Sequence, residues 1–316
     1  MELVYGRARI GEQLSHCILG FLSPIKQQFD DPRLTYEDFV FIDTRTVMLA
    51  ANGLADSGSP TTTLQVWYFD RPNVFHIGSF ALPSQTYDFE SLKFDGGPWL
   101  SLGGAKTLDG TPFAMSPASD ILAVSMRPGL IADFDDGSWD FTMVMRLGLM
   151  FDVLGVRPSD RVESFDRLYA GGSPINLALG RVLEWGKWGP QCTRWFPQPL
   201  DHQRWDQQLV GGRFVSVPPA WSDDDGEPVG LLMSQEDILL YDFRPEIVAR
   251  YAQSFPQDVC TETSLIPLGA LFYEDIFSNL PYHVTSKELP CVVPRVTMDD
   301  GRLICTEVNI QHYSRS

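Results

Sequence analysis

VMLAANG (47–53) and LQVWYFD (64–70) form a pair of short strand-like runs, and similar pairs recur along the chain. The repeats are ILAVSMRPG from Ile121 with WDFTMVMRL from Trp139, VGLLMSQED from Val229 with ILLYDF from Ile238, and RLICTEV from Arg302 with the tail ending near Tyr313. In each pair a turn leads into a strand of small and aliphatic residues, and the second strand often ends in an aromatic residue and an acid. Such pairs are typical of the inner strands of successive β-propeller blades.

The spacing of the four pairs predicts the number of blades. Blade repeats take about 40 to 50 residues, so each gap between successive pairs has room for roughly two blades. One blade cannot bury both faces of its sheet, whereas a ring of blades stacks face to face. We therefore expect a β-propeller-like, WD-repeat-like domain over residues 35–316, with about six or seven blades and an incomplete ring as an alternative.

The rest of the chain also consists largely of short strand-like runs. Strand-like runs, rich in β-branched and aromatic residues, lie at 39–51, 62–70, 74–82, 120–126, 141–150, 213–217, 229–233, 237–243, 265–273, 282–285 and 303–310. Strands and helices do not alternate, so the pattern favours an all-β class over a doubly wound sheet. The exception is an N-terminal lead-in (1–34), where a short helix is expected because apolar residues follow helical spacing at Leu14, Cys17, Ile18, Phe21, Leu22 and Ile25.

The charge of the chain argues against several classes of partner. The formal charge is −17 over 316 residues, with a sequence pI near 4.6. Such a field repels phosphate backbones and anionic lipid headgroups, so we expect neither nucleic acid nor a membrane as a partner. The five cysteines are scattered and form no C-x-x-C pair, which is typical of reduced thiols. These features predict a soluble, intracellular protein of the cytoplasm or nucleus.

From about residue 180 the sequence contains five distinctive segments in order. They are WGKWGPQCTRWF (185–196), GGRFV (211–215), LLYDFRPEIVARY (239–251), LPYHVTSKELP (280–290) and VTMDDGRLI (296–304). In this order they resemble the C-terminal, propeller-like region of F-box proteins of mushroom-forming fungi. The resemblance covers about 130 residues and implies recognition of a protein substrate for a cullin-type ubiquitin ligase.

The F-box itself is expected to be missing from this chain. That module begins with Leu-Pro and leucine-rich helices, whereas 3–25 has no Leu-Pro start and a single helical pattern. The resemblance therefore implies a protein partner, with the ligase adaptor as a second partner only if an F-box lies outside this chain. Two alternatives stay open, namely a glycan-binding or glycan-hydrolysing propeller and a scaffold without a ligase link.

No sequence motif for catalysis or metal binding is present. The acidic stretches DFDDG (133–137) and SDDDGE (222–227) lack the ligand spacing of a calcium loop, and the five histidines show no zinc spacing. The chain also has no G-x-S-x-G elbow and no phosphate-binding G-x-x-x-x-G-K. We therefore expect a non-enzymatic chain without a cofactor. The two carboxylates of a glycosidase are the exception to this test, because the sequence does not give the distance between them.

One aromatic cluster is the candidate for partner contact. It combines four tryptophans with one arginine: Trp185, Trp188, Arg194, Trp195 and Trp205. Tryptophan and arginine dominate binding hot spots because they join a large apolar area to directed hydrogen bonds. Packing between blades is the alternative, because tryptophans also fill the space between sheets.

Overall fold

The computed structural model describes a large part of the chain in separate stretches. These are residues 34–42, 46–54, 60–70, 73–86, 89–94, 121–128, 140–155, 181–198, 209–210, 212–216, 237–266, 272–288, 295–298 and 303–306. The expected N-terminal helix, the expected strand at 229–233 and both acidic stretches lie outside these residues.

The first sheet follows the chain as an antiparallel meander and then gains one parallel strand. Its order is β1-β2-β3-β4-β8, with β8 parallel to β4. The strands are β1 (Leu34–Phe41), β2 (Thr46–Leu54), β3 (Pro60–Asp70), β4 (Asn73–Ala81) and β8 (Arg181–Leu183).

The second sheet is antiparallel throughout, in the order β5-β6-β7-β9. Its strands are β5 (Phe89–Phe94), β6 (Ile121–Pro128), β7 (Asp140–Arg146) and β9 (Thr193–Gln198). Between β7 and β9 the chain forms two helices, α3 (Leu147–Leu154) and α5 (Trp185–Cys192), and contributes β8 to the first sheet.

The third sheet has the order β10-β11-β12-β16-β13 and is also antiparallel. Its strands are β10 (Leu209–Val210), β11 (Arg213–Ser216), β12 (Asp237–Asp242), β13 (Val259–Cys260) and β16 (Tyr282–Glu288). Between β12 and β13 lie α6 (Pro245–Ser254) and the short η4 (Pro256–Asp258). The two remaining antiparallel pairs are β14 (Ser264–Ile266) with β15 (Ile276–Ser278), and β17 (Arg295–Met298) with β18 (Leu303–Thr306).

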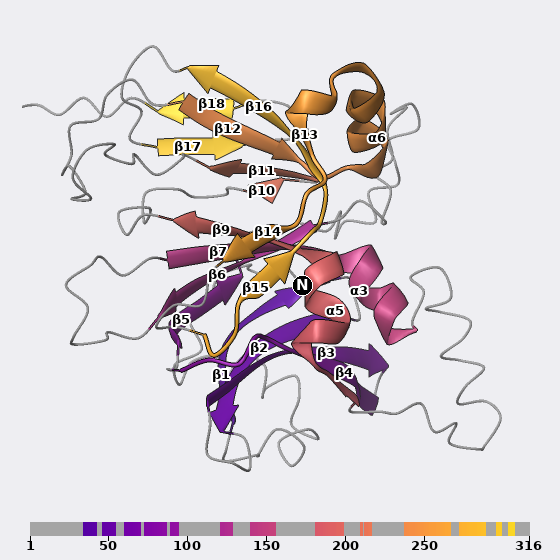
Figure 1. Cartoon of the computed structure of the whole chain (residues 1–316). Coiled ribbons are helices and arrows are strands. Elements are labelled where there is room, and N and C mark those ends of the chain that lie inside the picture. The colour runs from indigo at the N-terminus through magenta and orange to yellow at the C-terminus, as the bar shows by residue number, and fades with distance from the viewer. Residues whose placement is uncertain are drawn as a thin grey trace, which may run out of the picture.

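The three larger sheets stack face to face (Figure 1). One buried core joins the first and second sheets through residues such as Leu64, Phe80 and Leu122. A second core joins the second and third sheets through Ala123, Val144 and Phe214 among others. The second sheet is therefore buried on both faces, which explains why β6 and β7 are continuous apolar runs rather than alternating ones.

Two of the four recurring strand pairs of the sequence form neighbouring strands in this stack, whereas RLICTEV contains β18, whose one described neighbour is β17. The first pair forms β2 and β3, and the second forms β6 and β7, so each supplies the two middle strands of a run of four antiparallel strands. In the third sheet, ILLYDF forms β12, whose described neighbours are β11 and β16. The expectation of a mostly β protein is thus confirmed.

Among the described residues, helices α3, α5 and α6 lie where strands or loops were expected. The expected strand at 141–150 ends at Arg146, and the chain continues as α3 to Leu154. In α3 the buried residues Leu147, Met150 and Phe151 follow helical spacing. A short, almost wholly apolar run fits a buried strand and a buried helix equally well, so periodicity could not separate them. Helix α5 was missed because Gly186, Gly189 and Pro190 are poor helix formers.

Candidate functional site

The predicted tryptophan cluster lies in the interior of the molecule. Trp185 and Trp188 come from α5 and Trp195 from β9, and their exposed fractions are 7%, 0% and 3%. The ring of Trp185 makes edge contacts with the other two, with centroids 5.1 Å from Trp188 and 5.8 Å from Trp195. Trp188 also donates a 2.9 Å hydrogen bond from Nε1 to the carbonyl of Ala81.

These three tryptophans pack between α5, β9 and the neighbouring strands, as the packing alternative expected. Trp205 lies outside the described residues. A direct role of the cluster in partner binding stays a prediction, since the described tryptophans present almost no surface to solvent. In this structure the three tryptophans support the β14–β15 hairpin that packs against them.

A short β-hairpin, β14–β15, packs against the tryptophan cluster. One apolar face of the hairpin points to the core and the other points to solvent. Ile276 is 1% exposed and belongs to the same core as the three tryptophans, and Ile266 packs against that core. Phe272, just before β15, makes an edge contact with Trp195 at 5.7 Å. The side chains one position away point outward, because successive residues of a strand alternate between its two faces.

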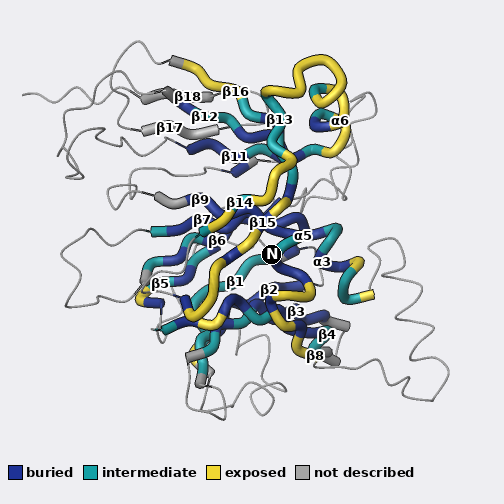
Figure 2. The backbone as a smooth tube through the Cα atoms, in the orientation of Figure 1, coloured by how far each residue is buried: buried dark blue, intermediate teal, exposed yellow. Residues whose placement is uncertain are grey.

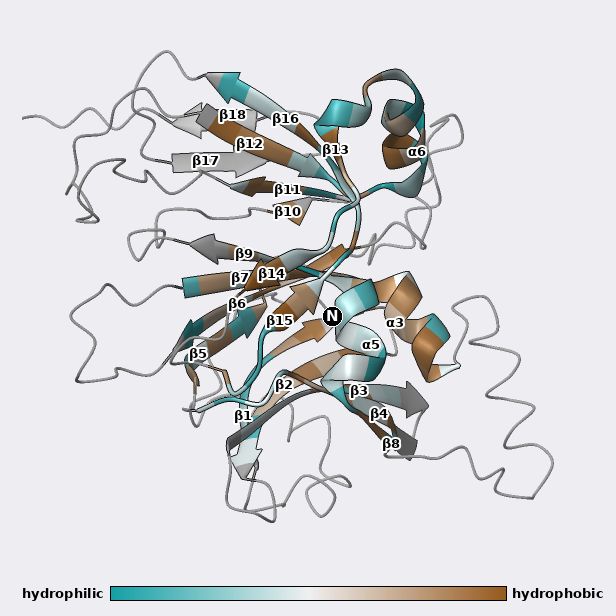
Figure 3. Cartoon of the chain, in the orientation of Figure 1, coloured by the Kyte–Doolittle hydropathy of each residue, from teal (hydrophilic) through white to brown (hydrophobic). Residues whose placement is uncertain are grey.

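The outward face carries large apolar residues that are exposed to solvent. Leu265 lies directly opposite Phe277 in the strand pairing, and they are 51% and 48% exposed. Tyr273, three residues before β15, is 59% exposed. We call these three residues, Leu265, Tyr273 and Phe277, the apolar ribbon. In Figure 2 the hairpin crosses the buried stack, with its exposed positions between less exposed or buried ones, and both its strands are largely hydrophobic in Figure 3.

Arg194, the fourth described residue of the predicted set, holds the base of this hairpin. The residue is 2% exposed and lies on β9. Its Nε donates a 3.1 Å hydrogen bond to the carbonyl of Leu280, and one terminal nitrogen donates a 3.0 Å bond to the carbonyl of Glu262. Glu262 precedes β14 and Leu280 follows β15, so one guanidinium binds both ends of the hairpin. The guanidinium also lies over the ring of Tyr282, 5.1 Å from its centroid.

Backbone hydrogen bonds fix the same base. The amide of Asn279 donates to the carbonyl of Pro190 at 2.8 Å, and the amide of Leu280 donates to the carbonyl of Thr193 at 3.1 Å. The hairpin is therefore anchored to α5 and β9 at its base and to the tryptophan core along its inner face. Its outward side chains are presented on a supported surface.

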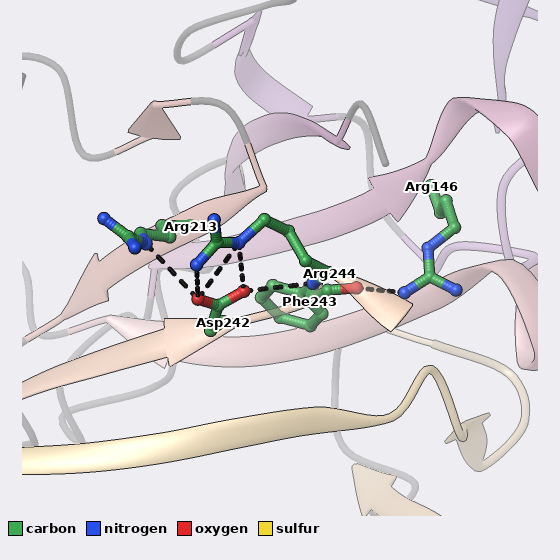
Figure 4. Close-up of polar contacts among 5 residues, drawn as sticks. All are labelled: Arg146, Arg213, Asp242, Phe243 and Arg244. Atoms are coloured by element: carbon green, nitrogen blue, oxygen red, sulfur yellow. Dashed lines mark hydrogen bonds and ion pairs between the residues drawn. The ribbon is translucent and has the colours of Figure 1, made fainter. Parts of the chain in front are cut away.

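A second polar cluster joins β11, β12 and the start of α6 (Figure 4). Asp242 accepts hydrogen bonds from Arg213, its direct cross-strand partner, at 3.2 Å, and from Nε of Arg244 at 2.9 Å. The Asp242 side chain is 8% exposed, and burial alone would raise its pKa. The hydrogen bonds and charges of Arg244 and Arg213 outweigh burial, so the pKa of Asp242 lies below its usual value.

Arg146 is a buried cation at the end of β7. One of its terminal nitrogens donates to the carbonyl of Phe243, while its Nε has no hydrogen-bond partner (Figure 4). Burial lowers the pKa of Arg146, and burial likewise raises the pKa of the nearby Cys192 thiol to about 12. Because the thiolate is the nucleophile, Cys192 is inert at neutral pH.

The described part of the chain contains no group of three or more His, Cys, Asp and Glu residues that could hold a metal ion. Its two histidines make structural contacts, since His76 stacks on Trp67 at 4.6 Å and His283 stacks on Tyr251 at 3.7 Å. Among the same residues, no helix is long and apolar enough to cross a membrane.

Comparison with known proteins gave no match to a family model, to a curated protein or to a solved structure. The geometry of the described residues therefore carries the functional argument.

The sequence pattern indicated the tryptophans and Arg194 that support the apolar ribbon, but it did not indicate the ribbon itself. It placed a strand at 265–273, where the structure has β14 and, at Phe272, an isolated bridge to Gln85. A signal was available in the charge pattern, because residues 251–282 contain no lysine and no arginine but several large apolar residues. Without the strand pairing, however, nothing in the sequence distinguishes buried Ile276 from exposed Phe277.

Proposed function

We propose that this chain is a non-enzymatic protein-binding domain that uses the apolar ribbon as its contact surface. The observation that carries the proposal is the exposed pair Leu265 and Phe277 on a hairpin whose base and inner face are fixed. Exposed apolar side chains that are grouped on a supported surface mark sites of protein interaction more often than isolated ones. The ribbon places two such side chains opposite each other, with Tyr273 nearby in the chain.

We propose that the hairpin belongs to a β-propeller domain. Three face-to-face sheets, each with a run of four antiparallel strands, support an arrangement of blades, of which we propose about six or seven. The resemblance of residues 185–304 to fungal F-box proteins supports a role in presenting a protein substrate to a cullin-type ubiquitin ligase. Within this proposal, the ligase adaptor would bind through an F-box outside the chain.

Co-purification of the full-length gene product from its native host tests both parts. We expect the wild-type protein to retain a reproducible set of proteins that the double variant Leu265→Ser/Phe277→Ser loses. Val182→Ser is the matched control, since Val182 is 54% exposed but lies on β8 of the first sheet. Equal retention by the wild type and the double variant would refute the ribbon as the contact surface. Recovery of partners without any ligase adaptor would refute the ubiquitin-ligase part alone.

A glycan array, run on the same samples, tests the alternative function. Glycan-binding sites also use exposed aromatic rings, and Tyr273 and Phe277 are exposed. The ribbon pairs Phe277 with an aliphatic leucine, which suits an apolar protein side chain better than a sugar ring. Ribbon-dependent binding to a defined glycan would replace protein binding as the proposed function.

A further inference from the structure

The apolar ribbon lies in a long segment of the chain that contains no lysine or arginine. Residues 251–282 contain no lysine or arginine, and their four acidic residues are Asp258, Glu262, Glu274 and Asp275. Four of the five large apolar side chains that are markedly exposed in the described residues also fall in this segment: Phe255, Leu265, Tyr273 and Phe277. Apolar exposure and negative charge thus coincide along the chain.

The acidic residues flank the hairpin at both ends. Glu262 lies two residues before β14, and Glu274 and Asp275 lie immediately before β15. Glu262 and Glu274 are exposed, and neither forms an ion pair with another described residue. Their charges are therefore available to a partner, and the net charge of −17 adds to the same field.

The charge also argues against self-association through this surface. A twofold contact between two copies would place the same acidic residues of both chains around one apolar centre. Like charges brought together at an interface weaken the wrong pairing, whereas opposite charges steer the right one. A second copy of this chain is therefore a poor occupant of the ribbon.

The dimensions of the hairpin favour a short segment of a partner. Each strand has three residues and is roughly 10 Å long, and Leu265 and Phe277 lie directly opposite each other across the pair, about 5 Å apart. An extended peptide of about three residues spans the same length as one strand of the hairpin, so one or two of its apolar side chains reach Leu265 and Phe277. Because the hairpin is already anchored by Arg194 and by the tryptophan core, binding would not have to order it first.

We propose that the apolar ribbon binds a basic segment of a partner protein, in which apolar side chains contact Leu265 and Phe277 and lysine or arginine side chains face Glu262 and Glu274. This inference rests on the proposed protein-binding function and names the class of partner for the same surface.

Three synthetic peptides separate the two components of the proposed recognition. One alternates leucine with lysine, the second replaces lysine with glutamate, and the third replaces leucine with serine. In fluorescence anisotropy with the full chain, we expect binding of the leucine–lysine peptide, with an affinity that falls as salt screens the charges. The other two peptides should bind at least about tenfold more weakly, because each lacks one component.

Variants of the chain assign the binding to the ribbon. Phe277→Ser should weaken the leucine–lysine peptide by about tenfold or more, as expected for a hot-spot side chain. Glu262→Lys/Glu274→Lys should weaken it several-fold and flatten its salt dependence. Val182→Ser should bind as the wild type does. Equal binding by Phe277→Ser and the wild type would overturn the proposal, since the peptide would then bind elsewhere on an acidic surface.

The remaining outcomes separate this inference from the proposed function. If the co-purified partners depend on Leu265 and Phe277 but the leucine–lysine peptide does not bind, protein binding stands and the basic class of partner is wrong. If sedimentation velocity shows a dimer that Phe277→Ser dissociates, the occupant is a second copy and the inference is overturned. Both experiments use the folded chain, and circular dichroism of each variant confirms that its sheets are retained.

Discussion

Gly189 shows how tightly the residues that support the apolar ribbon are packed. It is buried in α5, and a Cβ atom at this position would overlap the indole of Trp185. We expect Gly189→Ala to destabilise the protein by about 1–3 kcal/mol, because the ring cannot move without disturbing Trp188 and Trp195. Urea unfolding followed by circular dichroism measures the change.

Gly186 provides a control within the same helix. It is exposed, and a Cβ atom there would meet nothing within 4 Å. Gly186→Ala should therefore leave stability unchanged or raise it by up to about 1 kcal/mol, as alanine favours the helix. Similar losses from both substitutions would show that the contact with Trp185 is not what requires Gly189.

Arg194 is the residue on which the position of the hairpin depends most directly. Arg194→Met removes the hydrogen bonds to Glu262 and Leu280 and leaves their carbonyls without this donor. We expect a loss of about 3 kcal/mol. Hydrogen exchange should accelerate at the amides of β14 and β15 more than elsewhere.

Arg250→Met is the matched control for the loss of an arginine. Arg250 is exposed on α6, so its replacement should change stability by less than about 0.5 kcal/mol. Unchanged exchange of β14 and β15 in Arg194→Met would mean that the backbone bonds from Asn279 and Leu280 hold the hairpin without help.

At the scale of residues, the sequence identified which side chains gather but not which way they face. Trp185, Trp188, Arg194 and Trp195 stand close together in the chain, and α5 and β9 keep them together in space. Their burial depends on Phe272 and Ile276, which lie about 80 residues further along. Such long-range contacts leave no periodic signal, so a packing role and a binding role looked alike.

At the scale of elements, Asp242 links two strands and a helix through its charge. Its pKa lies below the usual value because Arg244 and Arg213 stabilise the carboxylate more than burial destabilises it. The folded state therefore holds its proton less tightly than the unfolded state. The resulting stabilisation is complete above the ordinary aspartate pKa of about 4 and is lost as the pH falls through the folded-state pKa.

Asp242→Asn removes this contribution and tests its pH dependence. We expect the variant to be less stable by about 2 kcal/mol at neutral pH. The difference from the wild type should shrink as the pH falls below about 4, because the wild-type carboxyl is then protonated too. Urea unfolding between pH 7 and pH 3 gives both curves.

The exposed pair Glu184 and Lys187 is the comparison for this buried cluster. Their side chains are 78% and 58% exposed and lie 3.3 Å apart. Glu184→Gln should cost less than about 0.5 kcal/mol at neutral pH, since water and salt screen a surface pair. Parallel pH curves for Asp242→Asn and the wild type would contradict the expected linkage.

Strands were predictable where burial of one or both faces of their sheet gives the sequence a recognisable hydrophobic pattern. The runs that became β3, β4, β6 and β12 lie within two residues of the expected bounds. The expected strand at 39–51 is instead two strands, β1 and β2, which form a hairpin around Ile42. Helix α6 follows β12 after the turn at Phe243 and Arg244, and only Val248 of its residues is buried, so its apolar signal is weak.

At the scale of the whole molecule, the second sheet makes the stack interdependent. Its side chains form part of both large cores, so loss of this sheet would expose the inner faces of both neighbours. Leu122 faces the first sheet, and Phe214 of the third sheet belongs to the other core, both with an exposed fraction of 0%. We expect the three sheets to unfold in one transition, despite their separate cores.

Leu122→Ala and Phe214→Ala test this coupling from its two sides. Each should destabilise the protein by about 3 kcal/mol, since each leaves a cavity in a buried core. Three probes should shift together in both variants: circular dichroism for the sheets, tryptophan fluorescence, to which Trp185, Trp188 and Trp195 of the first core contribute, and alkylation of Cys192, mapped by mass spectrometry. Cys192 is buried and its pKa is raised to about 12, so it reacts only when α5 opens. If Phe214→Ala shifted the circular dichroism transition alone, while fluorescence and Cys192 labelling kept their wild-type midpoints, the third sheet would unfold independently.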